Sequence, residues 1–413
     1  MNKDDLTPIS LRGARAILPD QTEEDATVLV EGGLITGVSA RDSGRARAET
    51  RIYDLGGLTL YPGSIDVHIH GAVGVDTLEA TPDDLRRVSR FLASRGVTSW
   101  LPTLVPAPTE DYRRAVASIE TLISEQHAEE SEEREEDSPG TPSTSVGARA
   151  LGVHYEGPFV NVAQCGALRT EYFRAYADPE SLAGLPTPVG QHAARMITVA
   201  PEIEGGVALV RELAARGWVV SIGHTRADTR TLDAARDAGA RHMTHFFNAM
   251  SPLHHRAPGV VGWGLLEDGV TCDLVADGVH SDPLMLRLAL RCKTAARLSL
   301  ISDAVLPAGL GDGEYNVWGE TITVESGRTR NARGSIAGSV ITMLDAARLM
   351  LSLGVAPHEV ARMASLNPAR LLGVDQDCGS IEVGKRADLV AIDAEGRARL
   401  TLVGGRVAFD ALG

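Results

Sequence analysis

Residues 65–71 read IDVHIHG, an apolar run that carries two histidines one residue apart. A run of this length suits a strand, and side chains two positions apart on a strand point to the same face. A buried strand rarely carries two imidazoles on one face unless they have polar partners. His68 and His70 are therefore the first candidates for a metal site, and their strand is the first element of the predicted fold.

Strand-like and helical patterns alternate after this run. Apolar strand-like runs recur at VTSWLPTLV (97–105), ALGVHYEGPF (150–159), RMITVAPE (195–202), WVVSIGHT (218–225), ARHMTHFFNA (240–249), VTCDLVADGVH (270–280) and LSLISDAV (298–305). Helical patterns separate most of them. Eight strands that alternate with helices predict an α/β fold of the (β/α)8 TIM-like barrel type. The alternative is a doubly wound sheet, but the first strand is followed by no Gly-rich phosphate turn.

The two ends of the chain differ from its middle. Short β-like runs with Gly and Asp turns fill residues 11–60, and similar runs recur near the C-terminus. We predict a small β-sandwich domain built from residues 1–62 and 366–413, joined to a barrel of residues 63–365. The segment HAEESEEREEDSPGTPSTSVG (127–147) combines a block of like charge with Pro, Ser and Gly, and we expect a mobile surface loop there.

Composition limits the partners and the compartment. The net charge of −15 over 413 residues argues against nucleic acid and anionic membranes as partners. The sequence shows no signal-peptide pattern and no apolar run of about 18 residues, so no membrane span is expected. The four cysteines are scattered and form no CxxC pair, which is typical of reduced thiols in a cytoplasmic protein.

Polar residues end several of the predicted strands. In a (β/α)8 barrel the carboxyl ends of the strands meet at one mouth, where catalytic groups lie. The residues expected at that mouth are His68, His70, Glu156, His224, His245 and Asp303. Imidazoles and a carboxylate suit a divalent metal such as Zn²⁺, and Asp303 suits a general base. A lone buried histidine is more often part of the core, and we interpret His154, His192 and His242 in that way.

The same residues lie in motifs that resemble a known family. PGSIDVHIHG resembles the first barrel strand of the amidohydrolase superfamily. LGVHYEGPFVN, SIGHT, THFFNAMSPLHHRAPG, LVADGVH and ISDAVLPAGLGDGEYNVWG together resemble its N-acetylglucosamine-6-phosphate deacetylase family. The resemblance spans nearly the whole chain. It implies that the acetamide of N-acetylglucosamine 6-phosphate is hydrolysed to glucosamine 6-phosphate and acetate.

The resemblance also implies site roles. Glu156, His224 and His245 would bind one divalent ion, and the intact pair His68 and His70 would allow a second. Zn²⁺ is the first choice, with Fe²⁺, Mn²⁺, Co²⁺ and Cd²⁺ as alternatives. Asp303 would activate water and later protonate the leaving amine.

Further family positions imply contacts with the substrate. Asn248 and Ala249 of the FNAM motif would lie near the sugar and its phosphate. Arg256 and His280 would bind the phosphate from a neighbouring subunit, which implies a homodimer. Ala167 would also contact the substrate.

One position departs from the family pattern. Leu168 stands where the family usually has a histidine that donates a hydrogen bond to the substrate. Loss of one such donor typically lowers the rate by about 10²–10³. Three explanations remain open: the metal polarises the carbonyl alone, another donor replaces the histidine, or the N-acyl sugar is a different one.

Three other functions are weighed against this reading. Amidohydrolases that bridge two metals with a carboxylated lysine at the end of the fourth strand are disfavoured, because RMITVAPE contains no lysine and the only mid-chain lysine, Lys293, lies on a helical pattern far from any strand end. A deaminase is disfavoured by the phosphate-binding residues that the resemblance implies. A catalytically silent sugar-phosphate-binding homologue is supported by Leu168 alone.

Overall fold

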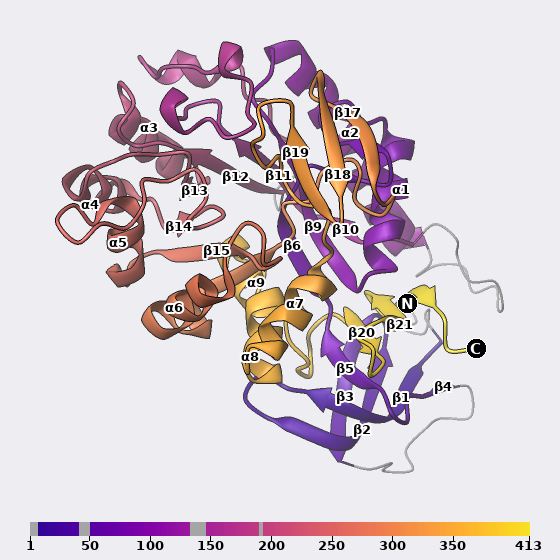
Figure 1. Cartoon of the computed structure of the whole chain (residues 1–413). Coiled ribbons are helices and arrows are strands. Elements are labelled where there is room, and N and C mark those ends of the chain that lie inside the picture. The colour runs from indigo at the N-terminus through magenta and orange to yellow at the C-terminus, as the bar shows by residue number, and fades with distance from the viewer. Residues whose placement is uncertain (1–6, 41–49, 133–145, 190–192) are drawn as a thin grey trace.

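The computed structural model describes residues 7–40, 50–132, 146–189 and 193–413. It shows a parallel barrel beside a separate sheet that is built from both ends of the chain (Figure 1). The barrel strands are β6 (Ser64–Ile69), β9 (Val97–Leu104), β11 (Gly152–Glu156), β12 (Ala194–Val199), β13 (Val219–Ile222), β14 (His242–Met243), β15 (Thr271–Val275) and β16 (Leu298–Ile301). The predicted (β/α)8 architecture is confirmed.

The barrel closes between its first and last strands. The Asp303 amide donates to the His68 carbonyl at 3.0 Å, and the His70 amide donates to the Ala304 carbonyl at 2.8 Å. All residues of β6 and β9 are buried, as expected for parallel strands that are covered on both sides. The short strand β10 (Arg149–Ala150) adds to the edge of β9.

Helices cover the outside of the barrel. They are α1 (Pro82–Ala93), α2 (Thr109–Glu132), α3 (Gly206–Ala215), α4 (Thr229–Ala238), α5 (Gly259–Leu266), α6 (Pro283–Lys293), α7 (Met343–Ser352), α8 (Pro357–Ala361) and α9 (Asn367–Leu372). Helix α1 shows why they form: Thr81 caps its first turn through Asp84, Pro82 follows the cap, and Leu85, Val88 and Leu92 bury one face. None of the described helices is long and apolar enough to cross a membrane.

The predicted acidic loop is only partly visible. Helix α2 continues to Glu132, so residues 127–132 are helical and the prediction of a loop there is wrong. Glu110 and Asp111 in its first turn favour the helix because they complement its dipole. Residues 133–145 lie outside the described residues, and the expected mobility of that part stays a prediction.

The second sheet joins the two ends of the chain. Its strands are β1 (Ile9–Ile17), β2 (Thr22–Glu31), β3 (Leu34–Ala40), β4 (Arg51–Asp54), β5 (Thr59–Pro62), β20 (Leu389–Ile392), β21 (Ala398–Val403) and β22 (Arg406–Asp410). They form one mixed eight-stranded sheet with its own apolar core. Strand β5 pairs with β20, which ties the N-terminal strands to the C-terminal ones. All these strands lie within 1–62 and 366–413, although the domain boundaries themselves stay a prediction.

Two small sheets lie outside this plan. Strands β7 (Gly71–Ala72) and β8 (Val75–Asp76) form a short hairpin directly after β6. Strands β17 (Gly313–Val317), β18 (Glu320–Glu325) and β19 (Arg328–Asn331) form a three-stranded sheet inserted after β16. This inserted sheet brings residues distant in sequence to the barrel mouth.

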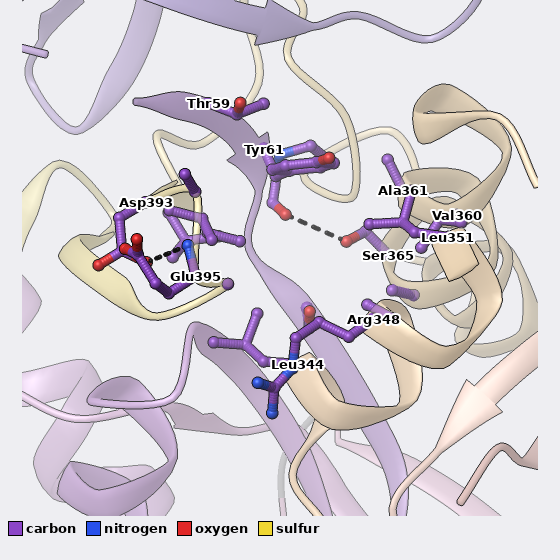
Figure 2. Close-up of a pocket in the computed structure, with 18 residues that line it drawn as sticks. Thr59, Tyr61, Leu344, Arg348, Leu351, Val360, Ala361, Ser365, Asp393 and Glu395 are labelled. Carbon is purple, nitrogen blue, oxygen red and sulfur yellow. Dashed lines mark hydrogen bonds between the residues drawn. The ribbon is translucent and has the colours of Figure 1, made fainter. Parts of the chain in front are cut away.

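A cavity of about 200 Å³ lies between the barrel helices and the second sheet, and we call it the side cavity. Figure 2 shows Thr59 and Tyr61 of β5 facing Leu344 and Arg348 of α7 across it. Its walls are mainly apolar. Ser365 is used within the fold, because its hydroxyl donates to the Gly63 carbonyl at 2.8 Å.

Candidate active site

The predicted mouth residues lie together at the carboxyl ends of the barrel strands. Their side chains are buried, and they are His68 in β6, His70 just after it, Glu156 at the end of β11, His224 after β13, His245 after β14 and Asp303 after β16. Each comes from a different strand except the first two. The barrel topology therefore gathers in space what the sequence scatters over more than half of the chain.

Three of these residues have an unusual backbone. His224, His245 and Asp303 have φ values of +48°, +30° and +50°, a region that residues other than glycine seldom adopt. Such a conformation costs about 1–3 kcal/mol and persists only where the surroundings fix it. Asp303 is fixed on both sides: its amide donates to His68, and its carbonyl accepts from the Ser339 amide at 2.7 Å. The sharp turn aims each side chain across the mouth.

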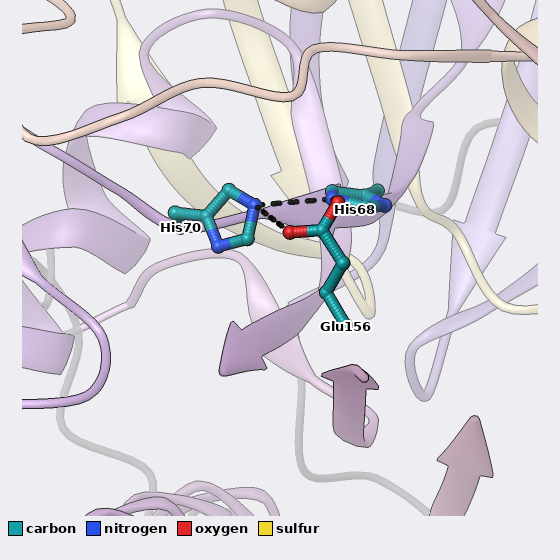
Figure 3. Close-up of side chains that lie close together, drawn as sticks. All are labelled: His68, His70 and Glu156. Atoms are coloured by element: carbon teal, nitrogen blue, oxygen red, sulfur yellow. Dashed lines mark hydrogen bonds and ion pairs between the residues drawn. The ribbon is translucent and has the colours of Figure 1, made fainter. Parts of the chain in front are cut away.

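Glu156 lies at the centre of the cluster. Its Oε1 is 2.8 Å from His224 Nε2 and 2.9 Å from His245 Nε2. Its Oε2 is 3.3 Å from His70 Nε2, and Figure 3 shows His68, His70 and Glu156 converging from two strands. The carboxylate thus serves two groups of potential ligands, one with His68 and His70 and one with His224 and His245.

The donor set fits one or two divalent ions. The Nε2 atoms of His68 and His70 are 3.1 Å apart, and those of His224 and His245 are 3.2 Å apart. Ring nitrogens that converge in pairs on a shared buried carboxylate are arranged as ligands are around a cation. Imidazole and carboxylate are the ligands that zinc and other first-row divalent metals accept.

The charges in this cluster are strongly coupled. Burial alone would raise the pKa of Glu156, but the charge of His224 and hydrogen bonds from three neighbouring rings hold that pKa well below its usual range. Burial lowers the pKa of His68 well below its usual value. Burial also disfavours the charged form of His70, yet Asp303 and Glu156 raise the pKa of His70 to about 10. Closely spaced groups of this kind titrate as one system.

Asp303 lies beside the candidate ligands His68 and His70 and lines the open side of the site. Its Oδ1 is 3.4 Å from Nε2 of both His68 and His70. It also lines a cavity of about 300 Å³ at the barrel mouth, which we call the mouth cavity. A carboxylate at the boundary between ligands and cavity can exchange protons with a molecule bound there.

The mouth cavity contains most of the predicted substrate residues. Ala167, Asn248, Ala249 and His280 line it, together with Leu168. The His280 ring is oriented by Asp277, whose Oδ2 is 2.7 Å from His280 Nδ1.

The expectation that Arg256 and His280 reach the site of a neighbouring copy stays a prediction. Within one chain, His280 lines the mouth cavity. Hydrogen bonds within the same turn hold His280 in this position, since Asp277 accepts from the backbone amides of Val279 and His280 at 2.8 Å. Arg256 is exposed, lies outside this cavity, and donates to His255 Nε2 at 2.8 Å.

Sequence reasoning missed two supporting residues. Asp66 accepts from the Ser302 hydroxyl at 2.5 Å and from the His68 amide at 3.3 Å, so it joins the first and last barrel strands beneath the ligands. Its position two residues before His68 was the available signal. Trp318, in the turn between β17 and β18, packs edge-on against His70 with ring centroids 5.2 Å apart. No local pattern indicated that contact.

The interpretation of His154 and His242 as core residues agrees with their surroundings, whereas His192 lies outside the residues that the structure describes. Both ring nitrogens of His154 lie close to protein oxygens, the Val67 carbonyl at 3.0 Å and Thr198 Oγ1 at 2.9 Å. His242 Nε2 is 2.8 Å from Asp273 Oδ1, and both residues are fully buried. These histidines form a polar layer inside the barrel, below the ligand cluster.

Known proteins share this fold and much of this sequence. The amidohydrolase family pattern matches residues 59–408. An N-acetylglucosamine-6-phosphate deacetylase of Bacillus subtilis (strain 168) is 38% identical over 351 residues, which cover 85% of this chain and 84% of the relative. An N-acetylgalactosamine-6-phosphate deacetylase of Escherichia coli O157:H7 is 39% identical over 338 residues, which cover 81% of this chain and 84% of the relative.

A solved structure extends the likeness to the whole chain. It shows a mutant N-acetyl-D-glucosamine-6-phosphate deacetylase of Mycobacterium smegmatis in complex with N-acetyl-D-glucosamine-6-phosphate. The identity is 29% and the TM-score is 0.83, over 98% of this chain and 100% of that one. Sequence and structure agree that this chain belongs to the amidohydrolase family.

Proposed function

We propose that this chain hydrolyses the acetamide of N-acetylglucosamine 6-phosphate to glucosamine 6-phosphate and acetate, as a metal-dependent amidohydrolase of amino-sugar metabolism. The observation that carries the proposal is the shared Glu156 between two histidine pairs, with Asp303 beside it and a cavity in front. The deacetylase names of the relatives support the same reaction.

Five residues of the cluster would bind metal. Glu156, His224 and His245 would hold one divalent ion, and His68 and His70 would hold a second with the same Glu156. Zn²⁺ is the preferred candidate because the donors are imidazole and carboxylate. A divalent ion held there supplies Lewis-acid polarisation of the acyl carbonyl and lowers the pKa of water.

Asp303 would move the proton. It accepts a proton from water as the water oxygen bonds to the acyl carbon, and returns it to the nitrogen as the C–N bond breaks. The water oxygen ends in acetate, and the nitrogen leaves as the free amine. The position of Asp303, 3.4 Å from both His68 and His70, supports this role because the reacting carbonyl has to approach the same groups.

Binding of the sugar phosphate would use other residues of the same cavity. Asn248, Ala249, His280 and Ala167 all line it. We further propose a homodimer in which the exposed Arg256 reaches the phosphate in the neighbouring copy, since an arginine fork suits a phosphate dianion. Free, scattered cysteines support a cytoplasmic location.

The 4-epimer is a second candidate substrate. The relative from Escherichia coli O157:H7 is named for N-acetylgalactosamine 6-phosphate and is 39% identical to this chain, against 38% for the Bacillus subtilis relative. A difference this small does not separate the two sugars. The position of Leu168 in the mouth cavity adds a different N-acyl sugar as a further candidate.

The test uses the full chain loaded with Zn²⁺. N-acetylglucosamine 6-phosphate, N-acetylgalactosamine 6-phosphate and unphosphorylated N-acetylglucosamine are supplied in parallel, and acetate and free amine are both measured. We expect the highest kcat/KM for N-acetylglucosamine 6-phosphate. A higher value for either of the other sugars would overturn the substrate assignment, and no acetate from any of them would overturn the function.

A further inference from the structure

The mouth cavity is lined by two chemically different sets of residues. Asn248 and His280, on the connections after β14 and β15, present hydrogen-bonding groups. Leu168, Trp318 and Ile336 line the cavity from the connections after β11 and β16, and they are large and mainly apolar, with Ser335 as a polar neighbour. Glu156 and Asp303 line the same cavity. A molecule bound at the cluster therefore has both hydrogen-bonding groups and large apolar side chains within the same cavity.

Leu168 is held by a loop that packs against a ligand ring. Its amide donates to the Cys165 carbonyl at 2.9 Å, and the side chain is 3% exposed. The neighbouring Gly166 has a φ of +59°, and a Cβ added there would lie 3.6 Å from Cε1 of His224. The loop is thus in van der Waals reach of the ligand cluster, and the position of Leu168 relative to that cluster is fixed.

Trp318 is held just as firmly. Its indole Nε1 donates to Asp76 Oδ2 at 2.7 Å, and Asp76 is itself held by the Leu78 amide at 2.9 Å. With its N–H used in this way, the indole turns an apolar edge toward His70, at an interplanar angle of 82°. Trp318 also packs against the small apolar cluster of the inserted sheet, which Ala167 contacts as well.

The reaction chemistry assigns an occupant to these apolar residues. An amide carbonyl at the cluster carries two substituents, the sugar nitrogen on one side and the acyl chain on the other. The sugar carries hydroxyls and a phosphate, which suit hydrogen bonds with Asn248 and His280. The acyl chain would then contact the apolar residues of the cavity. Leu168 has no hydrogen bond to offer, but it stabilises a hydrocarbon chain by removing it from water.

We propose that Leu168, Trp318 and Ile336 form an acyl-binding wall, and that the enzyme accepts N-acyl amino sugar phosphates with acyl chains longer than acetyl. The inference rests on the proposed function, because it assumes amide hydrolysis at this cluster. Each buried methylene is expected to raise kcat/KM roughly fourfold while the wall has room. N-propanoyl glucosamine 6-phosphate is then hydrolysed at least as efficiently as the N-acetyl compound.

Ratios of kcat/KM between acyl chains test the wall. The N-acetyl, N-propanoyl and N-butanoyl forms of glucosamine 6-phosphate are assayed by release of free amine. Leu168→Ala makes room for a longer acyl chain at the acyl-binding wall and should raise the butanoyl-to-acetyl ratio by at least about threefold. Leu168→Phe fills that room and should lower the ratio by at least as much. Ile336→Phe gives a second route to the same loss at a site that is 38% exposed, where folding is little affected.

A matched control lies in the same loop. Val162 is 62% exposed and does not line the mouth cavity, so Val162→Ala should leave both the rate and the ratio unchanged. The acyl-binding wall is overturned if the propanoyl form is hydrolysed more slowly than the acetyl form, or if the butanoyl-to-acetyl ratio is unchanged in the Leu168 and Ile336 variants. Either result would leave the deacetylase function intact.

Binding separates the two proposals if no amide is hydrolysed. Titration calorimetry with Asp303→Asn compares the affinities of the acetyl and butanoyl compounds. Tighter binding of the butanoyl compound, abolished in the Leu168→Phe background, supports the wall even though the proposed function has failed. Equal affinities overturn the wall as well.

Discussion

The mouth cavity and the side cavity have similar volumes, about 300 Å³ and about 200 Å³, yet they have different contents. The mouth cavity opens onto a buried carboxylate surrounded by histidine nitrogens, whereas the side cavity is framed mainly by apolar residues of β5, α7, α8 and β20. Charged groups lie on the side cavity too, but they pair with residues outside its lining: Asp393 accepts from Arg397 Nε at 2.9 Å, and Arg348 pairs with Asp345. Volume alone therefore does not mark a functional site.

The backbone shows the same contrast. At the mouth, His224, His245 and Asp303 are held at positive φ, and strain of this kind requires a supporting structure. At the side cavity, Tyr61 and Val390 lie in ordinary paired strands. Residues at positive φ with converging side chains distinguish the mouth, whereas paired strands with apolar side chains at the side cavity indicate packing between two parts of the fold.

The largest expected effect comes from Glu156→Gln. The substitution removes the charge shared by the two histidine pairs, and we expect loss of bound Zn²⁺ with a fall in kcat of about 10⁴-fold or more. Metal content by mass spectrometry and initial rates measure both effects. Glu395→Gln, the same change at the side cavity, is the matched control and should alter neither. Retained metal in the Glu156 variant would show that the carboxylate is not a ligand.

Asp303→Asn should have the next largest effect. It keeps the shape of the side chain but removes its ability to accept a proton, so kcat is expected to fall by about 10²–10³. Metal content should stay within experimental error of the parent protein, since the proposed ions are held by other residues. Initial rates and metal analysis on the same preparation check this. More than a tenth of the parent rate would remove Asp303 from the proton-transfer role.

Asp66→Ala tests a residue that acts through its neighbours. Without Asp66, the Ser302 hydroxyl and the His68 amide lose their acceptor, and the strand that carries His68 is less firmly placed. Residues that orient metal ligands typically change metal affinity by about 10–100-fold, and we expect that loss here. Competition with a chelator measures it, and Asp66→Asn, which keeps an acceptor oxygen, should recover most of the affinity. Equal affinity of both variants and the parent would make Asp66 a purely structural residue.

The cluster could be predicted from the sequence because a barrel converts sequence order into position. Glu156, His224, His245 and Asp303 each end or follow a strand, and parallel strands bring those ends together without any knowledge of side-chain packing. The alternation of IDVHIHG placed His68 and His70 on one face by the same local rule. The alternation of side chains along a strand and the topology of the barrel were enough to predict which residues form the cluster.

The walls of the mouth cavity could not be predicted in this way. Trp318 and Ile336 reach the mouth through an inserted sheet, and its docking depends on contacts such as the Trp318–Asp76 hydrogen bond between residues 242 positions apart. The position of His280 in the mouth cavity has a similar origin, since no strand pattern tells which cavity a residue in a connection will line. Contacts of this range depend on tertiary packing and leave no periodic signal.

The smallest expected effect on activity, and the sharpest test of the comparison, is Leu344→Ala at the side cavity. Leu344 is 8% exposed and packs with Val390 and Ala398, so its truncation should lower the free energy of unfolding by about 2–4 kcal/mol. Denaturant unfolding measures that loss, and kcat/KM at 25 °C should stay within about twofold of the parent because no ligand of the cluster contacts this wall. Leu168→Ala makes the same chemical change at the mouth and should shift acyl-chain preference instead. If Leu344→Ala lowered kcat/KM tenfold while the protein remained folded, the two cavities would be coupled, and the side cavity would have to be treated as part of the functional machinery.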